Sequence, residues 1–227
     1  MNKKLCVLIL SALNVFGIEN SEKVFSEIYE NGWWGFNEEG KGFSGIGSTL
    51  HNNEVYISFI QDFVKKNKIK TIVDAGCGDW TFSKEVDWGD AEYLGLDVVK
   101  SVIDEDIRKY SSDKIKFKQF DLLTEPLPPA DLLICKDVLM HLTNGDIQNF
   151  LTKIKNYKHC LFTHNIADVD QSNVNKEINR GWFRELDLTA PPFNLKGVKV
   201  LTYDTDHSVK QIVYYGNYTE GDSKGDL

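Results

Sequence analysis

The sequence predicts an α/β protein with a doubly wound, mainly parallel seven-stranded sheet that carries one antiparallel strand near the C-terminus. From residue 70 onward, short apolar or β-branched runs alternate with polar and helix-like segments, as they do in parallel sheets. A glycine-rich turn follows the first run, and the last two runs are joined by a short polar turn that is typical of a hairpin. Ligands of such sheets bind at the carboxyl ends of the strands.

Composition places the chain among ordinary globular proteins. It has 227 residues, of which 41% are hydrophobic and 26% charged, so one domain can bury a core without disulfides or metals. The four cysteines match no zinc-binding spacing, and we expect buried free thiols rather than a metal site. They are Cys6, Cys77, Cys135 and Cys160.

The charge balance disfavours nucleic acid as a partner. The formal net charge is −8, whereas nucleic-acid-binding domains usually carry a broad basic surface. One basic run stands out, and we interpret it as the solvated end of a helix. It contains Lys65, Lys66, Lys68 and Lys70.

The first residues resemble a secretory signal peptide. Met1–Lys4 is positively charged and Leu5–Phe16 is apolar, so residues 1–17 fit the pattern of a cleaved leader. The apolar run is too short for a transmembrane helix. A helix packed on the domain is the alternative. We therefore expect a protein that is exported or delivered into another cell, or a cytoplasmic protein if the segment is not cleaved.

Two helices are predicted before the sheet. Ser21–Tyr29 has helical composition with Ser21 as a candidate cap, and Asn52–Lys68 has apolar residues at mostly helical spacing. Between them, residues 31–48 are rich in glycine and aromatic residues and should be irregular.

The strands and helices that follow can be assigned from composition and length. Helices are expected at Trp80–Val86, Val99–Tyr110 and Asp146–Ile154. Strands are expected at Lys70–Asp74, Glu92–Val98, Ile115–Asp121, Asp131–Cys135, Cys160–Thr163, Gly197–Tyr203 and Lys210–Tyr215.

The most informative motif is the turn after the first strand, VDAGCGDW (residues 73–80). Glycines at such a turn allow a sharp bend and a close approach of ligand to backbone, and a following helix would offer free N–H groups. Asp97 ends the second strand about 20 residues later, where a carboxylate can accept ribose hydroxyls. Asp121 ends the third strand, and Lys136 and Asp137 end the fourth. All these segments should meet at one edge of the sheet.

This set of motifs resembles the class I, Rossmann-like S-adenosylmethionine-dependent methyltransferases. VDAGCGDW is similar to their first motif, YLGLDVV to the ribose-binding motif, FKQFDLL to the adenine-side motif and DLLICKDVLMHL to the fourth-strand motif. The resemblance covers about residues 70–142. It implies S-adenosylmethionine as cofactor, with Asp97 at the ribose, Asp121 at the adenine and the Lys136 carbonyl at the donor's ammonium. The implied cofactor-binding residues are Asp74, Gly76, Gly78, Asp79, Asp97, Val98, Asp121, Leu122 and Lys136.

The resemblance also divides the chain. Residues 18–69 would form N-terminal helices and a cap over the donor site, 70–217 the methyltransferase domain and 218–227 a polar tail. Gly45–Ser48 (GIGS) would lie near the methionine end of the donor. Trp80 stands where many members carry a third glycine, which suggests a tighter loop or one partly capped by an aromatic ring. Asp74 and Asp121 have a structural alternative, as a loop cap and a turn residue.

A nicotinamide-dependent dehydrogenase is disfavoured. A dinucleotide fingerprint requires a third glycine for helix packing, and Thr81 occupies that position counted from Gly76. No second mononucleotide-binding half is evident in the C-terminal third.

Residues for the chemistry should follow the fourth and fifth strands. Asp137 and His141 are the candidate catalytic pair, because a spacing of four places them on one helical face. His141 has a structural alternative, packed at a helix start. Thr163–Asn165 closes the fifth strand, where functional and structural roles are equally open.

The acceptor wall is expected in the segment between the fifth and sixth strands. Arg184 is a candidate clamp for an acidic acceptor or a partner of Asp187, which we interpret as structural. The aromatic residues Trp33, Trp34 and Phe36 form either a lid or part of the core.

Two functions follow from these observations. The first is a methyltransferase that acts on an unidentified small-molecule or protein acceptor. The second is a non-catalytic donor-binding or interaction protein that retains the fold. The sequence does not specify the acceptor or the oligomeric state.

Overall fold

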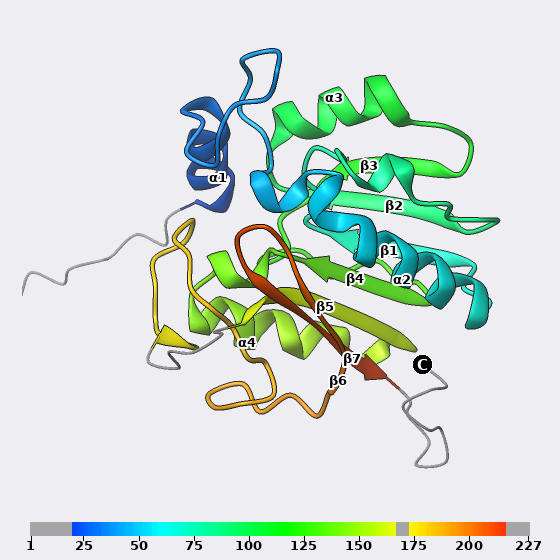
Figure 1. Cartoon of the computed structure of the whole chain (residues 1–227), viewed down its shortest axis with the longest axis vertical. Helices are drawn as coiled ribbons and strands as arrows, with labels where there is room; N and C mark the ends of the chain where they lie inside the picture. The colour runs from blue at the N-terminus through cyan, green and yellow to red at the C-terminus, as the bar shows by residue number, and fades with distance from the viewer. Residues whose placement is uncertain (1–19, 167–172, 217–227) are drawn as a thin grey trace, which may run out of the picture.

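The computed structural model describes residues 20–166 and 173–216. The predicted leader (1–17), Cys6 and the predicted polar tail (218–227) lie outside these residues. Figure 1 shows a central twisted sheet with helices on both faces and α1 at one end of the strands.

The seven strands form one sheet in the order β3-β2-β1-β4-β5-β7-β6. β7 runs antiparallel to both β5 and β6, and every other pairing is parallel. The predicted fold class is therefore confirmed. The strands are β1 (Thr71–Ala75), β2 (Glu92–Asp97), β3 (Ile115–Gln119), β4 (Leu132–Lys136), β5 (His159–Ile166), β6 (Val198–Asp204) and β7 (Val209–Gly216).

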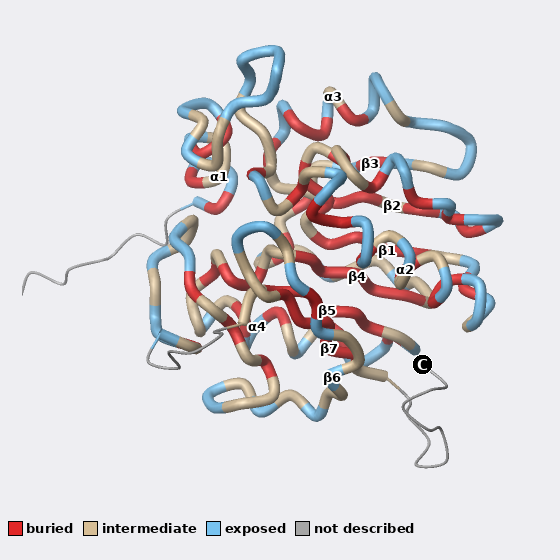
Figure 2. Tube along the Cα trace, in the orientation of Figure 1, coloured by how far each residue is buried: buried red, intermediate tan, exposed pale blue. Residues whose placement is uncertain are grey.

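Helices cover both faces of the sheet because each presents one apolar stripe. On one face, α2 (Glu54–Lys66) and α3 (Lys100–Tyr110) pack into a cluster that contains Ile60 and Ile103. On the other face, α4 (Asn144–Lys153) packs through Ile147 and Phe150, together with Leu186 from the segment between β5 and β6. The central strands are buried between these layers, as Figure 2 shows. This explains why their sequences read as continuous apolar runs.

The N-terminal helix α1 (Ser21–Glu30) lies at the end of the sheet where the ligand was expected (Figure 1). Ser21 was the predicted cap of this helix, but the cap is Asn20. The Asn20 Oδ1 accepts hydrogen bonds from the backbone amides of Glu22 and Lys23. Tyr29 packs with Val99 and Val102, which ties α1 to the start of α3.

The predicted helix at Trp80–Val86 is wrong. Only a single 3₁₀ turn, Ser83–Glu85, forms there. Gly78 and Trp80 both have positive φ angles, of 59° and 55°, and a right-handed helix cannot pass through such residues. The Asp79 carboxylate accepts instead from the backbone and hydroxyl of Thr81. No helix start therefore follows the glycine turn.

Several predictions about single residues are confirmed. Lys65, Lys66, Lys68 and Lys70 are exposed at the end of α2, and the three described cysteines are buried free thiols. In the part of the chain that the structure describes, no helix is long and apolar enough to cross a membrane.

Replacing Ile60 by alanine is expected to lower the free energy of unfolding by about 2–5 kcal/mol, because the lost side chain leaves a cavity beneath the sheet. Ile60 is 0% exposed, whereas Val55 on the same helix is 47% exposed. Val55→Ala is therefore the matched control, with an expected change below about 0.5 kcal/mol. Urea unfolding monitored by circular dichroism measures both. Equal losses in the two variants would contradict this packing of α2.

Candidate functional site

A cavity of about 430 Å³ lies at the carboxyl ends of β1, β2 and β4, within the size range of small-molecule sites. The predicted residues that line it come from separate segments, which the parallel strands bring to one edge. They are Asp74, Gly76, Gly78, Asp97, Val98, Asp121, Leu122, Lys136, Asp137 and His141. Gly45–Ser48 also lines it, as expected for the GIGS segment.

The turn after β1 can be built only with glycine at two positions. Gly76 and Gly78 have φ angles of 87° and 59°. A Cβ on Gly76 would lie 2.3 Å from the Val138 side chain, and one on Gly78 would lie 2.4 Å from the Ser44 hydroxyl. Leu96 O accepts from the amides of Gly76 and Cys77, which holds the turn against β2. Both strain and crowding therefore exclude a side chain here.

Asp79 differs from the other predicted site residues because it does not line the cavity. Its Oδ2 accepts from Ser44 N at 3.0 Å, and its own amide donates to Ser44 Oγ at 2.9 Å. Ser44 Oγ is also 2.7 Å from the Tyr29 hydroxyl. This reciprocal pair fastens the N-terminal segment to the glycine turn, so the geometry gives Asp79 a positioning contact.

Asp97, at the end of β2, is oriented by backbone amides. Its Oδ2 accepts from Gly78 N at 3.1 Å and its Oδ1 from Val99 N at 2.9 Å. The residue also lines the cavity. Burial raises the pKa of Asp97, and hydrogen bonds from backbone amides offset part of this rise. The carboxylate is thus fixed by the turn that it faces.

Asp74, at the end of β1, is more deeply buried. Burial raises its pKa to about 6, opposed by the hydrogen bond from the Tyr93 hydroxyl at 2.7 Å and by the charge of Lys136. Asp121 is a turn residue that also lines the cavity, since its Oδ1 accepts from Leu123 N.

Asp137 lies between two buried lysines. Lys136 Nζ and Lys210 Nζ both donate to its Oδ2, at 2.6 and 2.7 Å. Although burial raises the pKa of Asp137, the two ammonium groups outweigh it and hold the pKa well below its ordinary value. The carboxylate is therefore a weak base, and its main partners are these lysines.

The spacing of Asp137 and His141 predicted that they share a helical face, and this prediction is wrong. Asp137 has a φ of 57°, and His141 ends a short 3₁₀ turn, Leu139–His141. The positive φ breaks the helix between them. Both side chains nevertheless reach the cavity, because the chain folds over its edge.

His141 is held in one tautomer. Its Nδ1 is 2.9 Å from the carbonyl oxygen of Trp182. Because a carbonyl only accepts, Nδ1 carries the hydrogen and Nε2 keeps its lone pair. Burial lowers the pKa of His141 below its ordinary value of 6.5, so the ring is neutral at pH 7. Its ring centroid lies 4.9 Å from that of Trp34.

Trp80 does not cap the glycine turn, which corrects that expectation. Its ring is buried against Tyr93, Tyr110 and Phe117, on the side of the sheet that α3 covers. Its positive φ of 55° is a conformation to which glycine is better suited. The aromatic contacts compensate for the strained backbone.

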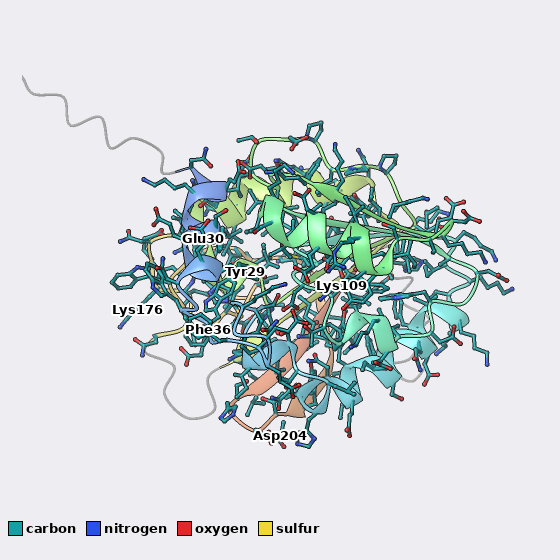
Figure 3. All side chains as sticks on the ribbon, turned by 90° about the horizontal axis from the view of Figure 1, so that it is seen from above. Tyr29, Glu30, Phe36, Lys109, Lys176 and Asp204 are labelled. Atoms are coloured by element: carbon teal, nitrogen blue, oxygen red, sulfur yellow. The ribbon has the colours of Figure 1, made fainter. Side chains whose placement is uncertain are left out.

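Of the three aromatic lid candidates, only Trp34 lines the cavity. Trp33 and Phe36 are exposed, and Figure 3 shows Phe36 on the outside of the N-terminal segment near Tyr29. Across the opening, Phe183 lines the cavity and lies 6.2 Å from the His141 ring. The mouth is thus framed by aromatic rings from two distant segments.

The residues that close β5 differ in their access to the cavity. Asn165 lines the cavity, whereas Thr163 and His164 are buried and do not. Burial lowers the pKa of His164 to about 4, so this ring is a neutral core residue.

Arg184 is not an acceptor clamp. It is buried, and its guanidinium donates to the Leu142 carbonyl at 2.7 Å and to Asn144 Oδ1 at 3.0 Å. Asp187 forms an ion pair with Lys199 at 2.9 Å and not with Arg184. Its predicted structural role is therefore confirmed, but with a different partner. Sequence reasoning could not identify these partners, because they depend on how the segment between β5 and β6 folds back.

Sequence reasoning also missed three residues of the site. Tyr29, Ser44 and Lys210 line the cavity. The one available signal was Lys210, a charged residue at the head of an otherwise apolar predicted strand. No cluster of His, Cys, Asp and Glu suited to a metal ion occurs within residues 20–166 and 173–216.

Comparison with known proteins agrees with this geometry. A family model described as a methyltransferase domain matches residues 73–157, which span the glycine turn, Asp97 and the β4 edge. Over these residues the chain is similar to methyltransferase domains. No curated protein sequence matches it.

Solved structures share the fold at low sequence identity. The N-methyltransferase NodS from Bradyrhizobium japonicum WM9, in complex with S-adenosyl-L-homocysteine, has a TM-score of 0.61 at 12% identity, over 86% of this chain and 97% of that one. Magnesium protoporphyrin IX methyltransferase from Synechocystis PCC 6803, with the same ligand, has a TM-score of 0.59 at 13% identity, over 85% and 96%. Human N-acetylserotonin methyltransferase in complex with SAM has a TM-score of 0.54 at 15% identity, over 88% and 60%.

A buried acid on α3 interacts electrostatically with groups at the glycine turn. Asp106 of α3 is 1% exposed, and its Oδ2 has no hydrogen-bond partner. Burial, together with the charges of Asp79 and Asp97, raises its pKa to about 8 from the ordinary 3.8. Because the pKa rises on folding, Asp106 favours the folded state at low pH, and this contribution is lost as the pH rises from 3.8 to about 8.

The Asp106→Asn variant should therefore gain stability relative to the wild type as the pH rises through this interval. The gain is at most about 1.4 kcal/mol per pH unit. Urea unfolding at several pH values between about 5 and 8 measures the difference. Asp104→Asn, on the exposed side of the same helix, is the control. A pH-independent difference between Asp106→Asn and the wild type would contradict this assignment.

Proposed function

We propose that this protein is an S-adenosylmethionine-dependent methyltransferase that acts on a small-molecule or protein acceptor. The observation that carries the proposal is the position of Asp97. Its carboxylate, held by backbone amides, lines the same cavity as the glycine turn. The ribose hydroxyls of a nucleoside are suitable hydrogen-bond donors to a carboxylate in this position.

The described residues suit the donor. Asp97 is placed to accept from the ribose hydroxyls and Asp121 from the adenine amino group. The backbone of Gly76 and Gly78 allows close approach, since no side chain can stand there. Phe25 and Leu122 add apolar surface to the cavity. When bound, S-adenosylmethionine supplies an electrophilic methyl group on a positively charged sulfur.

The contribution of the protein is mainly alignment. Holding donor and acceptor in line at short distance lowers the barrier by up to roughly 7–11 kcal/mol. The fastening of the N-terminal segment by Ser44 and Asp79 serves this purpose, because it fixes one wall of the cavity. Trp34 and Phe183 add aromatic surface to the cavity.

His141 is the better general base of the two catalytic candidates. Its Nε2 has a free lone pair and the residue lines the cavity, so it can take the proton from an acceptor O–H or N–H. The carboxylate of Asp137 is poorly basic because two lysines hold it. We assign it the positioning of these lysines.

Donor binding is tested by Gly76→Arg. The variant should lose binding of S-adenosylhomocysteine in calorimetry. The arginine side chain would clash with Val138 and extend into the cavity that Gly76 lines. Gly89→Arg is the matched control. Gly89 also has a positive φ, of 60°, but a Cβ at this position would have no heavy atom within 4 Å. It should bind as the wild type does. Wild-type protein that binds no S-adenosylhomocysteine would overturn the proposed function.

Transfer is tested by His141→Ala. We expect unchanged S-adenosylhomocysteine binding and a loss of roughly 10²–10⁴-fold in methyl transfer, the usual contribution of a general base. The measurement is mass spectrometry of extracts incubated with isotopically labelled S-adenosylmethionine. His51→Ala, at an exposed surface site, is the control. Extracts that yield no labelled product with the wild type would favour a non-catalytic donor-binding protein, and full activity of His141→Ala would exclude the base.

A further inference from the structure

The two lysines that hold Asp137 come from different strands. Lys136 ends β4 and Lys210 lies on β7, and their side chains are only 6% and 4% exposed. Both donate to the same oxygen of Asp137. Buried ammonium groups are costly unless they are paired. Here two ammonium groups share a single carboxylate.

Lys136 has further partners that balance its charge. Its Nζ lies 3.4 Å from the Gly47 carbonyl oxygen and 4.9 and 5.5 Å from the ring centroids of Phe82 and Tyr56. Asp74 faces it from β1, and its charge acts on the Lys136 pKa, which burial lowers. Lys136 is thus surrounded by protein groups.

Lys210 is different. Among the described residues, its Nζ donates only to Asp137 Oδ2, although an ammonium group has three hydrogens. The residue lines the cavity. Its remaining N–H groups therefore have no acceptor from the described protein.

The structure also keeps space beside Lys210. A Cβ on Gly47 would lie 3.4 Å from Lys210 Nζ and 3.7 Å from Asp137 Oδ2. Because residue 47 is glycine, no side chain fills the volume in front of the ammonium. The neighbouring lining is polar and small, with Ser48 and Ser208.

Charge is distributed unevenly along the cavity. Asp97 ends β2 and Asp121 follows β3, whereas Lys210 lies on β7, on the other side of β1 in the sheet order, and all three line the cavity. A bound molecule therefore meets hydrogen-bond acceptors at one end and an ammonium group at the other.

We propose that Lys210 binds a carboxylate of a ligand in this cavity, with Asp137 positioning the ammonium. The inference rests on the proposed function. A carboxylate would take the unused N–H groups in charge-assisted hydrogen bonds. Two ligands offer that group: the donor, through its methionine tail, and an acceptor that is itself a carboxylic acid.

The first arm of the test addresses the donor. S-adenosylhomocysteine carries the amino-acid tail and 5′-methylthioadenosine lacks it, so their affinity ratio in calorimetry reports contacts with the tail. If Lys210 holds the donor's carboxylate, Lys210→Met should reduce this ratio by about 10- to 100-fold. Lys210→Arg, which keeps the charge, should restore most of it.

The second arm addresses an acidic acceptor. Acetate and benzoate are titrated into the protein saturated with S-adenosylhomocysteine. If Lys210 holds an acceptor's carboxylate, one of them should bind the wild type and Lys210→Arg, and binding should weaken about 10- to 100-fold in Lys210→Met. The affinity ratio of the first arm then stays unchanged.

Lys199→Met is the matched control. Lys199 lies on β6 of the same hairpin and also pairs with an aspartate, Asp187, but its side chain is 44% exposed. It should behave as the wild type in both arms. In Figure 3, the label of Asp204 marks the turn end of this hairpin. The inference is overturned if S-adenosylhomocysteine binds and Lys210→Met alters neither arm. If S-adenosylhomocysteine does not bind the wild type, the proposed function fails instead.

Discussion

The turn that follows β1 is the constraint on which the site depends. Gly76 and Gly78 take backbone angles that other residues rarely adopt, and Leu96 O accepts from two consecutive amides of the turn. The same turn supplies the Gly78 amide that orients Asp97. It also presents Asp79 to Ser44, which fastens the N-terminal segment. One bend therefore sets the cavity floor, the carboxylate beside it and one of the walls.

Around this bend the protein departs from the usual strand–turn–helix arrangement. Trp80 occupies a left-handed conformation and inserts into the core between Tyr93 and Phe117, so that no α-helix follows. No α-helix N-terminus follows the glycine turn itself, and Asp97 accepts from the turn amide of Gly78 and from the Val99 amide at the start of α3. The cationic groups of the cavity are instead the two lysines at Asp137. Packing requirements of the core have thus altered the electrostatics of the site.

The mouth of the cavity combines segments that are far apart in the sequence. Trp34, His141 and Phe183 form a series of neighbouring rings, and His141 is oriented by the backbone of Trp182. The segment that carries Trp182 is anchored on α4 by the Arg180–Asp146 ion pair, with both side chains largely buried. The orientation of the His141 ring therefore depends on how this segment docks on α4.

The sequence by itself determined the succession of strands along the chain, because buried parallel strands require apolar runs. It also determined the two glycines of the left-handed turn and the carboxylates at the strand ends. It therefore predicted the fold class and placed Asp97, Asp121 and Lys136 at one edge. Only the tertiary structure decided the partners of charged groups. Arg184 could not be distinguished from a ligand clamp, nor Lys210 from a strand residue, because an ion pair depends on which distant segments meet. The failed helix at Trp80–Val86 has the same origin, since contacts of Trp80 with other strands overrode local propensity.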